Sequence, residues 1–326
     1  MSEDAVTAAV TATVVIPTYN GEHDHLVETL TAVMAQQAPF SWNVLVIDSG
    51  SSDGSVAILE RFAAAYDTFR LHQIPNAEFS HGGTRQRAAE MADGEFVVYL
   101  SQDAVPADPT WLARMVDGFS LSDRVAGVLG RQVPRRWCFP LQKRDIGLVF
   151  AAQGVDGAHT VYDASSLEQG RARYYSDVCS AARRSVLLGD VPYRDVPYAE
   201  DQAFGADLIE AGYLKVYADP ARVVHSNDIA LRDYRRRILD EFAGLEKVGV
   251  VLGRPPVREL LRELTGGVAR DILFTWRDRT YTAKQRLKFT VTAPLYRYSR
   301  WRGKLMAFRR EEGQSLEARR KSERGD

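Results

Sequence analysis

Over the first 230 residues, short apolar blocks alternate with turn residues and with segments of helical period. In the clearest block, residues 96–100 are all apolar, and the polar residues Ser101, Gln102 and Asp103 follow at once. A short apolar run that ends in turn residues is typical of a buried strand. Similar runs predict further strands at residues 13–16, 43–48, 69–72, 125–130, 179–182, 215–218 and 222–225.

Helical segments separate most of these strands. Leu26, Leu30 and Val33 recur at helical spacing after the first strand, and residues 84–91 are the clearest of the later helices. Strands that alternate with helices predict an α/β fold with a doubly wound sheet, because right-handed helical crossovers connect parallel strands. Residues 134–173 break the pattern, and we expect loops with short helices over the open edge of the sheet.

The sheet pattern ends near Leu231. Residues 231–326 have a helical period and many Arg residues, with Pro255 and Pro256 as a joint. We therefore predict two domains, residues 1–230 with the sheet and residues 231–326 as a helical, basic and aromatic extension. Three interpretations of this extension stay open: solvated helix faces, a surface for anionic lipid headgroups and a lipid-linked acceptor, and a self-association surface that makes a homo-oligomer.

The composition is that of a folded globular protein. Of the 326 residues, 45% are hydrophobic and 26% are charged, and the net charge of −1 gives no reason to expect a nucleic-acid partner. Cys138 and Cys179 are too few for a disulfide framework and lack metal-ligand spacing. The acidic N-terminus does not resemble a secretory signal, and no apolar run is long enough to span a membrane. We expect a cytoplasmic protein, with peripheral contact at the inner membrane surface left open.

Acids and turn residues follow three of the predicted strands. These are residues 18–20, residues 48–53 and Asp103. Ligands of open α/β sheets bind beyond the carboxyl ends of the strands, and carboxylates there accept hydrogen bonds from a base or a ribose. The chain has neither a glycine-rich dinucleotide fingerprint nor a phosphate loop. A bound diphosphate would therefore need Mg²⁺ or Mn²⁺ on Asp103 as its counter-charge.

Five motifs together make the chain recognisable. They are VIPTYN at residues 15–20, VIDSGSSDG at 46–54, GTR at 83–85, LSQD at 100–103 and ED at 200–201. In this order, over residues 12–230, they resemble the family 2 inverting glycosyltransferases with the GT-A fold. The resemblance implies a Rossmann-like mixed sheet flanked by helices, followed here by the helical extension. It also implies a nucleotide-sugar donor and a glycan or lipid-linked saccharide acceptor.

The resemblance assigns roles to single residues. Asp201 matches the general base that deprotonates the acceptor hydroxyl, and Asp103 with His225 matches the metal site. The donor-binding positions it implies are Pro17, Thr18, Tyr19, Asn20, Asp48, Asp53, Arg85, Gln102, Asp103 and Glu200. Taken alone, Asp48, Asp53 and Asp103 are equally typical of acids that cap turns, and Arg85 and His225 of ordinary surface residues.

One position departs from the family pattern. Ser101 stands where the family has the first acid of its D-x-D motif, which leaves Asp103 as the single carboxylate. The Gln-Asp-Ala form at 102–104, together with His81 and the residues after it, resembles the rhamnosyltransferase subgroup. That subgroup implies dTDP-L-rhamnose as the donor, and a UDP-linked sugar is the alternative.

The mechanism that the resemblance implies is a single displacement with inversion at the anomeric carbon. Asp201 would take the proton, for which an ordinary carboxylate pKa of about 4 suffices. Two other classes of protein account for these residues less well. A nucleotidyltransferase or methyltransferase should have a glycine-rich signature after the first strand, which residues 17–21 do not supply. A non-catalytic glycan-binding protein of the same fold would explain Ser101 but not Asp201.

Overall fold

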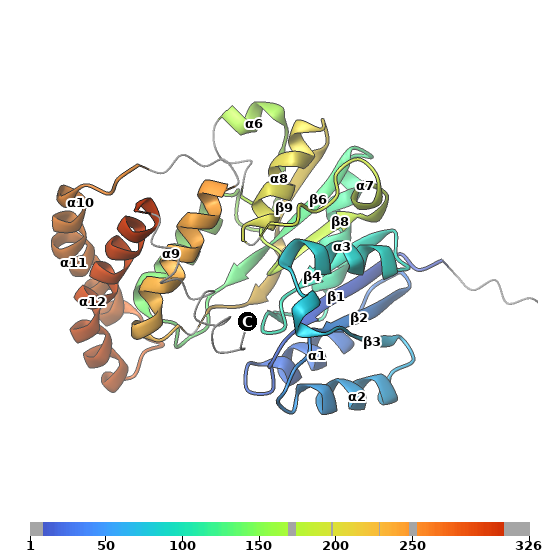
Figure 1. Ribbon diagram of the computed structural model, residues 1–326, viewed down its shortest axis with the longest axis horizontal. Helices are drawn as coiled ribbons and strands as arrows, with labels where there is room; N and C mark the ends of the chain where they lie inside the picture. Colours follow the sequence, from blue (N-terminus) through green and yellow to red (C-terminus); the bar gives the residue numbers. More distant parts are fainter. Residues whose placement is uncertain (1–8, 169–173, 197, 228, 248–252, 310–326) are drawn as a thin grey trace, which may run out of the picture. The chain divides into compact units, whose positions relative to one another are not determined.

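The computed structural model describes residues 9–168, 174–196, 198–227, 229–247 and 253–309. By its internal contacts the chain divides into two compact units, one formed by residues 1–133 and 149–225 and the other by residues 134–148 and 226–326. The second unit thus includes part of the segment that the sequence pattern assigns to loops over the sheet. Each unit is described by itself below (Figure 1).

The first unit is built on a nine-stranded sheet, which is mixed, as the resemblance implies. Eight strands run in the order β3-β2-β1-β4-β8-β6-β9-β5, and β7 pairs with β9. Figure 1 shows β1 to β4 side by side. The strands are β1 (Ala12–Thr18), β2 (Trp42–Asp48), β3 (Phe69–Gln73), β4 (Phe96–Leu100), β5 (Val105–Pro106), β6 (Val125–Val133), β7 (His159–Tyr162), β8 (Cys179–Arg183) and β9 (Leu214–Val224).

The strand register gathers the predicted site residues at one edge of this sheet. β1 is parallel to both β2 and β4, and Thr18 pairs with Asp48 where β1 and β2 end. β8 runs antiparallel to β4, so its first residue, Cys179, pairs with Leu100 at the end of β4. The residues just before β8 therefore lie beside the polar loop that follows β4.

Residues 215–218 and 222–225, expected to form two short strands, belong to one long strand. β9 pairs with β6 along its length, and the register shifts between Gly130 and Arg131 of β6. Ala218 pairs with Gly130 and Arg222 with Arg131, so residues 219–221 form a bulge. A bulge interrupts the alternation of side chains, which explains why the sequence pattern shows two strands.

The helices of the first unit cover the sheet. They are α1 (Leu26–Met34), α2 (Ser55–Ala65), α3 (His81–Met91), α4 (Trp111–Asp117), α6 (Ala164–Glu168), α7 (Arg184–Leu188) and α8 (Glu200–Glu210), with 3₁₀ turns η1 (Asn76–Glu78) and η2 (Gly118–Leu121). Apolar residues of the strands and helices, among them Val14, Val46, Val98, Leu30 and Leu59, are buried in one cluster. Burying such a side chain contributes roughly 1.5–3 kcal/mol, which holds the strand ends in place.

α3 begins three residues earlier than the sequence pattern indicates. The side chain of Ser80 accepts a hydrogen bond from the backbone N–H of Gly83 and caps the helix, so the glycine pair lies inside its first turn. Gly82 is required by packing, because a Cβ atom there would lie 2.1 Å from the carbonyl oxygen of Arg194. Helix propensity alone could not show that these glycines are helical.

The second unit is helical. Its elements are residues 140–148 of α5 (Pro140–Ala151), α9 (Leu231–Lys247), α10 (Val257–Arg262), the π-turn η3 (Glu263–Gly267), α11 (Val268–Arg277) and α12 (Ala283–Phe308). Buried Arg297 of α12 bonds both oxygens of Asp271 at 2.6 and 2.7 Å. Arg144 of α5 also bonds Asp271, which ties the 134–148 segment to this unit.

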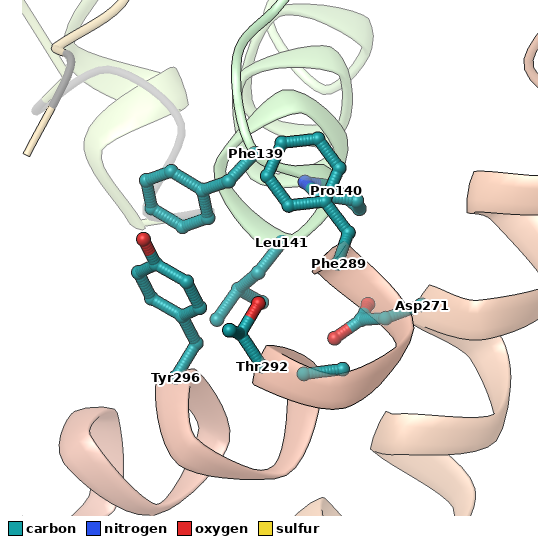
Figure 2. Close-up of a pocket in the computed structure, with 8 residues that line it drawn as sticks. Phe139, Pro140, Leu141, Asp271, Phe289, Thr292 and Tyr296 are labelled. Carbon is teal, nitrogen blue, oxygen red and sulfur yellow. The ribbon is translucent and has the colours of Figure 1, made fainter. Parts of the chain in front are cut away.

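Aromatic residues complete the core of the second unit. The rings of Phe139 and Tyr296 stack with their centroids 4.3 Å apart. Figure 2 shows them beside a small pocket that Leu141 and Phe289 also line, with the Asp271 carboxylate at its side. Among the described residues, no helix is long and apolar enough to cross a membrane.

Candidate active site

The loops after β1 and β2 are bound to each other through Asn20. Its backbone N–H donates to Ser51 Oγ at 2.9 Å, and its Oδ1 accepts from the backbone N–H of Ser52 at 2.8 Å. Asn20 has a φ of +47°, a left-handed conformation that Asn tolerates better than most residues. The predicted loop of residues 17–20 is therefore a braced structure.

The two acids of the second loop hold that loop in shape. Asp48 is fully buried, and its carboxylate accepts hydrogen bonds from the backbone N–H groups of Gly50 and Ser51 and from the Ser51 hydroxyl. Asp53 accepts from the N–H groups of Ser55 and Glu22. Burial acts to raise the pKa of Asp53, but these hydrogen bonds outweigh it and lower the pKa below its usual value. Both acids thus make the contacts expected of acids that cap turns, which is the alternative to a donor-binding role.

Gln102 ties the loop after β4 to the loop after β1. Its Oε1 accepts from the backbone N–H of Tyr19 at 2.9 Å, and its Nε2 donates to the Tyr19 carbonyl at 3.3 Å. Gly21 packs against this amide, since a Cβ atom there would lie 3.0 Å from the Gln102 side chain. The Gln102 amide is therefore engaged with protein backbone at both of its polar atoms.

Asp103 and His225, predicted to share a metal, are brought together by the sheet. β5 pairs Val105 with Val224, and the Asp103 carboxylate lies 3.3 Å from His225 Nε2. His225 is buried, and its Nδ1 lies 3.1 Å from the Gln132 Oε1 oxygen. Gln132 Oε1 is an acceptor, so Nδ1 is the ring atom that can donate to it, and Nε2 is the ring atom that faces Asp103.

Arg85 lies among carboxylates. Its Nη1 donates to Glu200 Oε1 at 2.8 Å, and its Nε lies 2.9 Å from Asp177 Oδ2, in ion-pair contact without the alignment of a hydrogen bond. Burial opposes its charge, but Glu200 and Asp177 outweigh that effect and raise the pKa of Arg85. The structure therefore brings Arg85 to the predicted acceptor side of the site, where it can hold Glu200 in place.

Asp177 is a site residue that the sequence analysis missed. Its Oδ1 accepts from Ser180 Oγ at 2.6 Å and from the Tyr193 hydroxyl at 3.0 Å. Burial, opposed by Arg85 and reinforced by the charge of Glu200, raises the pKa of Asp177. An acid just before the strand at 179–182 was the available signal, but it gains meaning only once β8 is known to run antiparallel to β4.

Asp201 lies in the first turn of α8, next to this cluster. Its Oδ2 accepts from the backbone N–H of Asp177 at 3.3 Å, and its Oδ1 from the N–H of Gln202 at 2.7 Å. Burial, and then the negative charges of Glu200 and Asp177, raise the pKa of Asp201 well above its usual value. The expectation of an ordinary carboxylate pKa was therefore wrong, because the sequence does not show how many acids share one cation.

The Asp201 cluster and the Asp103 loop are neighbours along the sheet edge. The backbone N–H of Ser101 donates to the Val178 carbonyl at 3.2 Å, and Val178 adjoins Asp177. Ser101, expected at the position of the first family acid, is thus bonded through its backbone to the segment just before β8 that includes Asp177. Two acidic sites therefore lie near the C-terminal end of β4. One is Asp103 beside His225, and the other is the set of carboxylates around Arg85.

A match to known proteins decides the family. The model of the family described as glycosyl transferase family 2 matches residues 13–187, more than half of the chain. The chain belongs to glycosyl transferase family 2. The predicted family is therefore confirmed, and so is the prediction of a transferase enzyme.

Two curated relatives of this family 2 glycosyltransferase act on O-antigen chains by their names. The O-antigen chain rhamnosyltransferase RfbN of Salmonella typhimurium is 28% identical over 280 residues, which cover 81% of this chain and 86% of the relative. The O-antigen chain rhamnosyltransferase WbaN of Salmonella anatum is 29% identical over 283 residues, with 81% and 85% covered. The protein is thus rhamnosyltransferase-like, as the motifs indicate.

Solved structures confirm the GT-A fold of this family 2 glycosyltransferase. The mannosyltransferase PcManGT from Pyrobaculum calidifontis, in complex with GDP-Man and Mn²⁺, matches with a TM-score of 0.57 and 18% identity over 94% of this chain and 88% of its own. Staphylococcus aureus TarS 1–349 matches with a TM-score of 0.54 and 16% identity, with 93% and 92% covered. At these identities the likeness concerns the fold alone, and the contacts of each site residue with a donor stay predictions.

Proposed function

We propose that the protein transfers L-rhamnose from dTDP-L-rhamnose to a hydroxyl group of a cell-surface glycan or lipid-linked acceptor. The observation that carries this proposal is that two acidic groups lie near the C-terminal end of β4. One is Asp201, whose pKa is raised, and the other is Asp103 with its neighbour His225. The rhamnosyltransferase names of both relatives and the Gln-Asp-Ala form at residues 102–104 support the sugar. The sheet-bearing residues 1–230 would bind the donor, and residues 231–326 would serve acceptor, membrane or subunit contacts.

The donor site would be formed by the braced loops. The backbone and side chains of residues 17–20, held by Asp48, Asp53 and Gln102, would receive the base and ribose of the nucleotide. We revise the roles of Arg85 and Glu200, because their contacts are with each other and with Asp177. Both residues would act as positioning residues for Asp201 rather than as donor ligands.

Asp103 and His225 fit a divalent cation such as Mg²⁺ or Mn²⁺. The Asp103 carboxylate and the His225 imidazole nitrogen, 3.3 Å apart, are both groups that bind metals in proteins. Among the described residues, no group of three or more His, Cys, Asp or Glu side chains gathers around a common point. This suits a cation of the Mg²⁺ type, which is held by one or two protein ligands together with substrate phosphates and water. When bound, it would supply positive charge to the departing diphosphate.

Asp201 would be the general base of a single displacement with inversion. The acceptor hydroxyl attacks the anomeric carbon, its proton passes to Asp201, and the bond to the diphosphate oxygen breaks. The raised pKa of Asp201 makes its carboxylate a stronger base than an ordinary aspartate. Because only the ionised form can take the proton, activity should fall as the pH falls through this raised pKa.

Thermal unfolding with a panel of nucleotide sugars and Mn²⁺ tests the donor. A ligand of the folded state at 100 times its Kd stabilises the protein by about 2.7 kcal/mol, and we expect dTDP-L-rhamnose to give the largest rise in Tm. Asp103→Ala should lose this rise. The control is Asp123→Ala, an exposed acid just before β6 at the opposite edge of the sheet. A larger rise with a UDP-linked sugar, or equal rises in both variants, would contradict the assignment.

A further inference from the structure

Large apolar side chains are exposed along one face of α12. Leu287, Val291, Leu295 and Tyr298 follow one another at intervals of three or four residues and therefore share a face of the helix. Their exposed fractions are 65%, 64%, 50% and 46%. A helix whose other face already packs in the second unit has no structural need for this apolar row.

Two further helices extend the row. Trp276 of α11 donates from its indole Nε1 to Thr290 Oγ1 at 3.1 Å, which places its exposed ring against α12. On the other side, Trp301 of α12 donates to the Pro256 carbonyl at the start of α10. We call the following exposed residues the apolar face: Val257, Leu261, Leu264, Leu273, Trp276, Leu287, Val291, Leu295 and Tyr298.

The helices that carry the apolar face are strongly basic. Residues 253–309 contain fourteen Lys and Arg residues but only four acids, in a chain whose net charge is −1. Each of the four acids already has a cationic partner within the second unit: Glu259 with Lys304, Glu263 and Asp271 with Arg297, and Asp278 with Lys143. The remaining positive charge is therefore not neutralised by these helices.

Nine of these cations are exposed, and seven of the nine lie between Val257 and Phe289. Among the described residues, none of the seven has a carboxylate within ion-pair distance, and they are Arg258, Arg262, Arg270, Arg277, Arg279, Lys284 and Lys288. In the sequence they lie among the residues of the apolar face, on α10, α11, α12 and the turn between α11 and α12. The surface thus combines aliphatic and aromatic side chains with a fringe of free positive charge.

We propose that the apolar face and its basic fringe lie on the surface of a bilayer that contains anionic phospholipids. Helices with aliphatic and aromatic residues on one face and Lys or Arg beside them bind in the interfacial plane, where the cations meet phosphate groups. A second copy of the chain fits less well, because pairing two such faces would bring two basic fringes together. The inference does not depend on the donor sugar.

Cosedimentation with vesicles, without any nucleotide sugar, tests this surface. At low ionic strength the full chain should bind vesicles of equimolar phosphatidylglycerol and phosphatidylcholine but not vesicles of phosphatidylcholine alone. Combining Leu287→Ser, Val291→Ser and Leu295→Ser should lower the partition coefficient by about tenfold or more. The matched control combines Val27→Ser, Leu121→Ser and Val155→Ser, which are comparably exposed in the first unit, and should bind like wild type.

A second variant separates charge from folding. Combining Arg277→Gln, Lys284→Gln and Lys288→Gln removes three fringe cations and keeps every apolar residue, and should also weaken binding about tenfold or more. Arg61→Gln, Arg87→Gln and Arg124→Gln on the first unit are its control. If the serine variant unfolds, this pair of variants decides the question alone.

Three outcomes would overturn the proposal. One is a wild-type chain that does not bind the anionic vesicles, and another is unchanged binding by both test variants. The third is light scattering that shows a wild-type oligomer which the serine variant converts to monomers while vesicle binding stays the same. That result would make the apolar face a self-association surface. Donor binding would be unaffected in every case, so failure here is distinguishable from failure of the proposed activity.

Discussion

Two groups of carboxylates stand at the same edge of the sheet and are held in opposite ways. Asp48 and Asp53 follow β2, and their oxygens accept hydrogen bonds from backbone N–H and hydroxyl groups of the braced loops. Asp177, Glu200 and Asp201 lie where β8 and α8 begin, and Arg85 is the guanidinium placed among them. The first group is stabilised by neutral dipoles, whereas the second is a buried excess of negative charge.

This difference in how the carboxylates are held suggests a separate role for each group: donor binding for the first and proton transfer for the second. Hydrogen bonds lower the pKa of Asp53, so it stays ionised and keeps its loop in one shape. Burial and neighbouring charge raise the pKa of Asp201, which makes it the better proton acceptor. Strongly perturbed acids cluster at functional sites. We therefore assign the reaction to the second group, in which burying several carboxylates around one guanidinium lowers the stability of the fold.

The largest expected effect is the loss of the proposed base, Asp201. Asp201→Asn keeps the size of the side chain but cannot take a proton, so we expect the rate of sugar transfer to fall by about 10²–10⁴-fold. Donor-induced thermal stabilisation should persist, because among the described residues no hydrogen bond or ion pair joins Asp201 to the loops proposed to hold the donor. Transfer to a saccharide acceptor, measured by release of the nucleotide diphosphate, checks this.

Glu210→Gln is the matched control for that variant. Glu210 is the exposed last residue of the same helix, and its substitution should leave the transfer rate near that of wild type. Wild-type activity in Asp201→Asn would remove Asp201 from the mechanism. Loss of donor stabilisation together with activity would instead assign Asp201 to donor binding.

Much of the first group could be predicted from the sequence, because its residues are local. Asn20, Asp48 and Asp53 follow apolar strands directly, and turn chemistry at strand ends is visible in the order of residues. In the second group, Arg85 lies about 90 to 115 residues before the acids that it contacts, and Asp177 joins the group only because β8 is antiparallel to β4. Local sequence patterns show neither the direction of β8 nor how many cations lie near the buried carboxylates.

Removing the cation from the second group should have the next largest effect, on stability. Arg85→Gln leaves the buried acids uncompensated, and breaking a buried ion pair costs about 3–5 kcal/mol. An acid whose folded-state pKa is raised contributes stability that is present below the unfolded pKa and lost as the pH rises through the folded pKa. Urea unfolding should therefore show a larger deficit at pH 8 than at pH 5.

Arg87→Gln is the control on the same helix. Arg87 pairs with Glu78 at 3.0 Å, but both side chains are about half exposed, and such surface pairs contribute about 0–1 kcal/mol. If Arg85→Gln is no more costly than Arg87→Gln, or if its deficit does not grow with pH, the acids around Arg85 are not a buried charge excess. That result would contradict the claim that the two groups of carboxylates are held in opposite ways.

The smallest effect concerns the backbone that presents the second group. Ala199, just before Glu200, has a φ of +62°, a left-handed conformation that costs a residue with a Cβ atom roughly 1–2 kcal/mol. Ala199→Gly should therefore raise the free energy of unfolding by up to about 1 kcal/mol, because glycine's greater freedom in the unfolded state offsets part of the relief. In exposed Ala57 of α2, which has helical φ, the same change should lower it by about 1 kcal/mol. If the turn also positions the base, Ala199→Gly should slow transfer while it stabilises the fold. Stabilisation with full activity would show that α8 holds Asp201 without the strained residue before it.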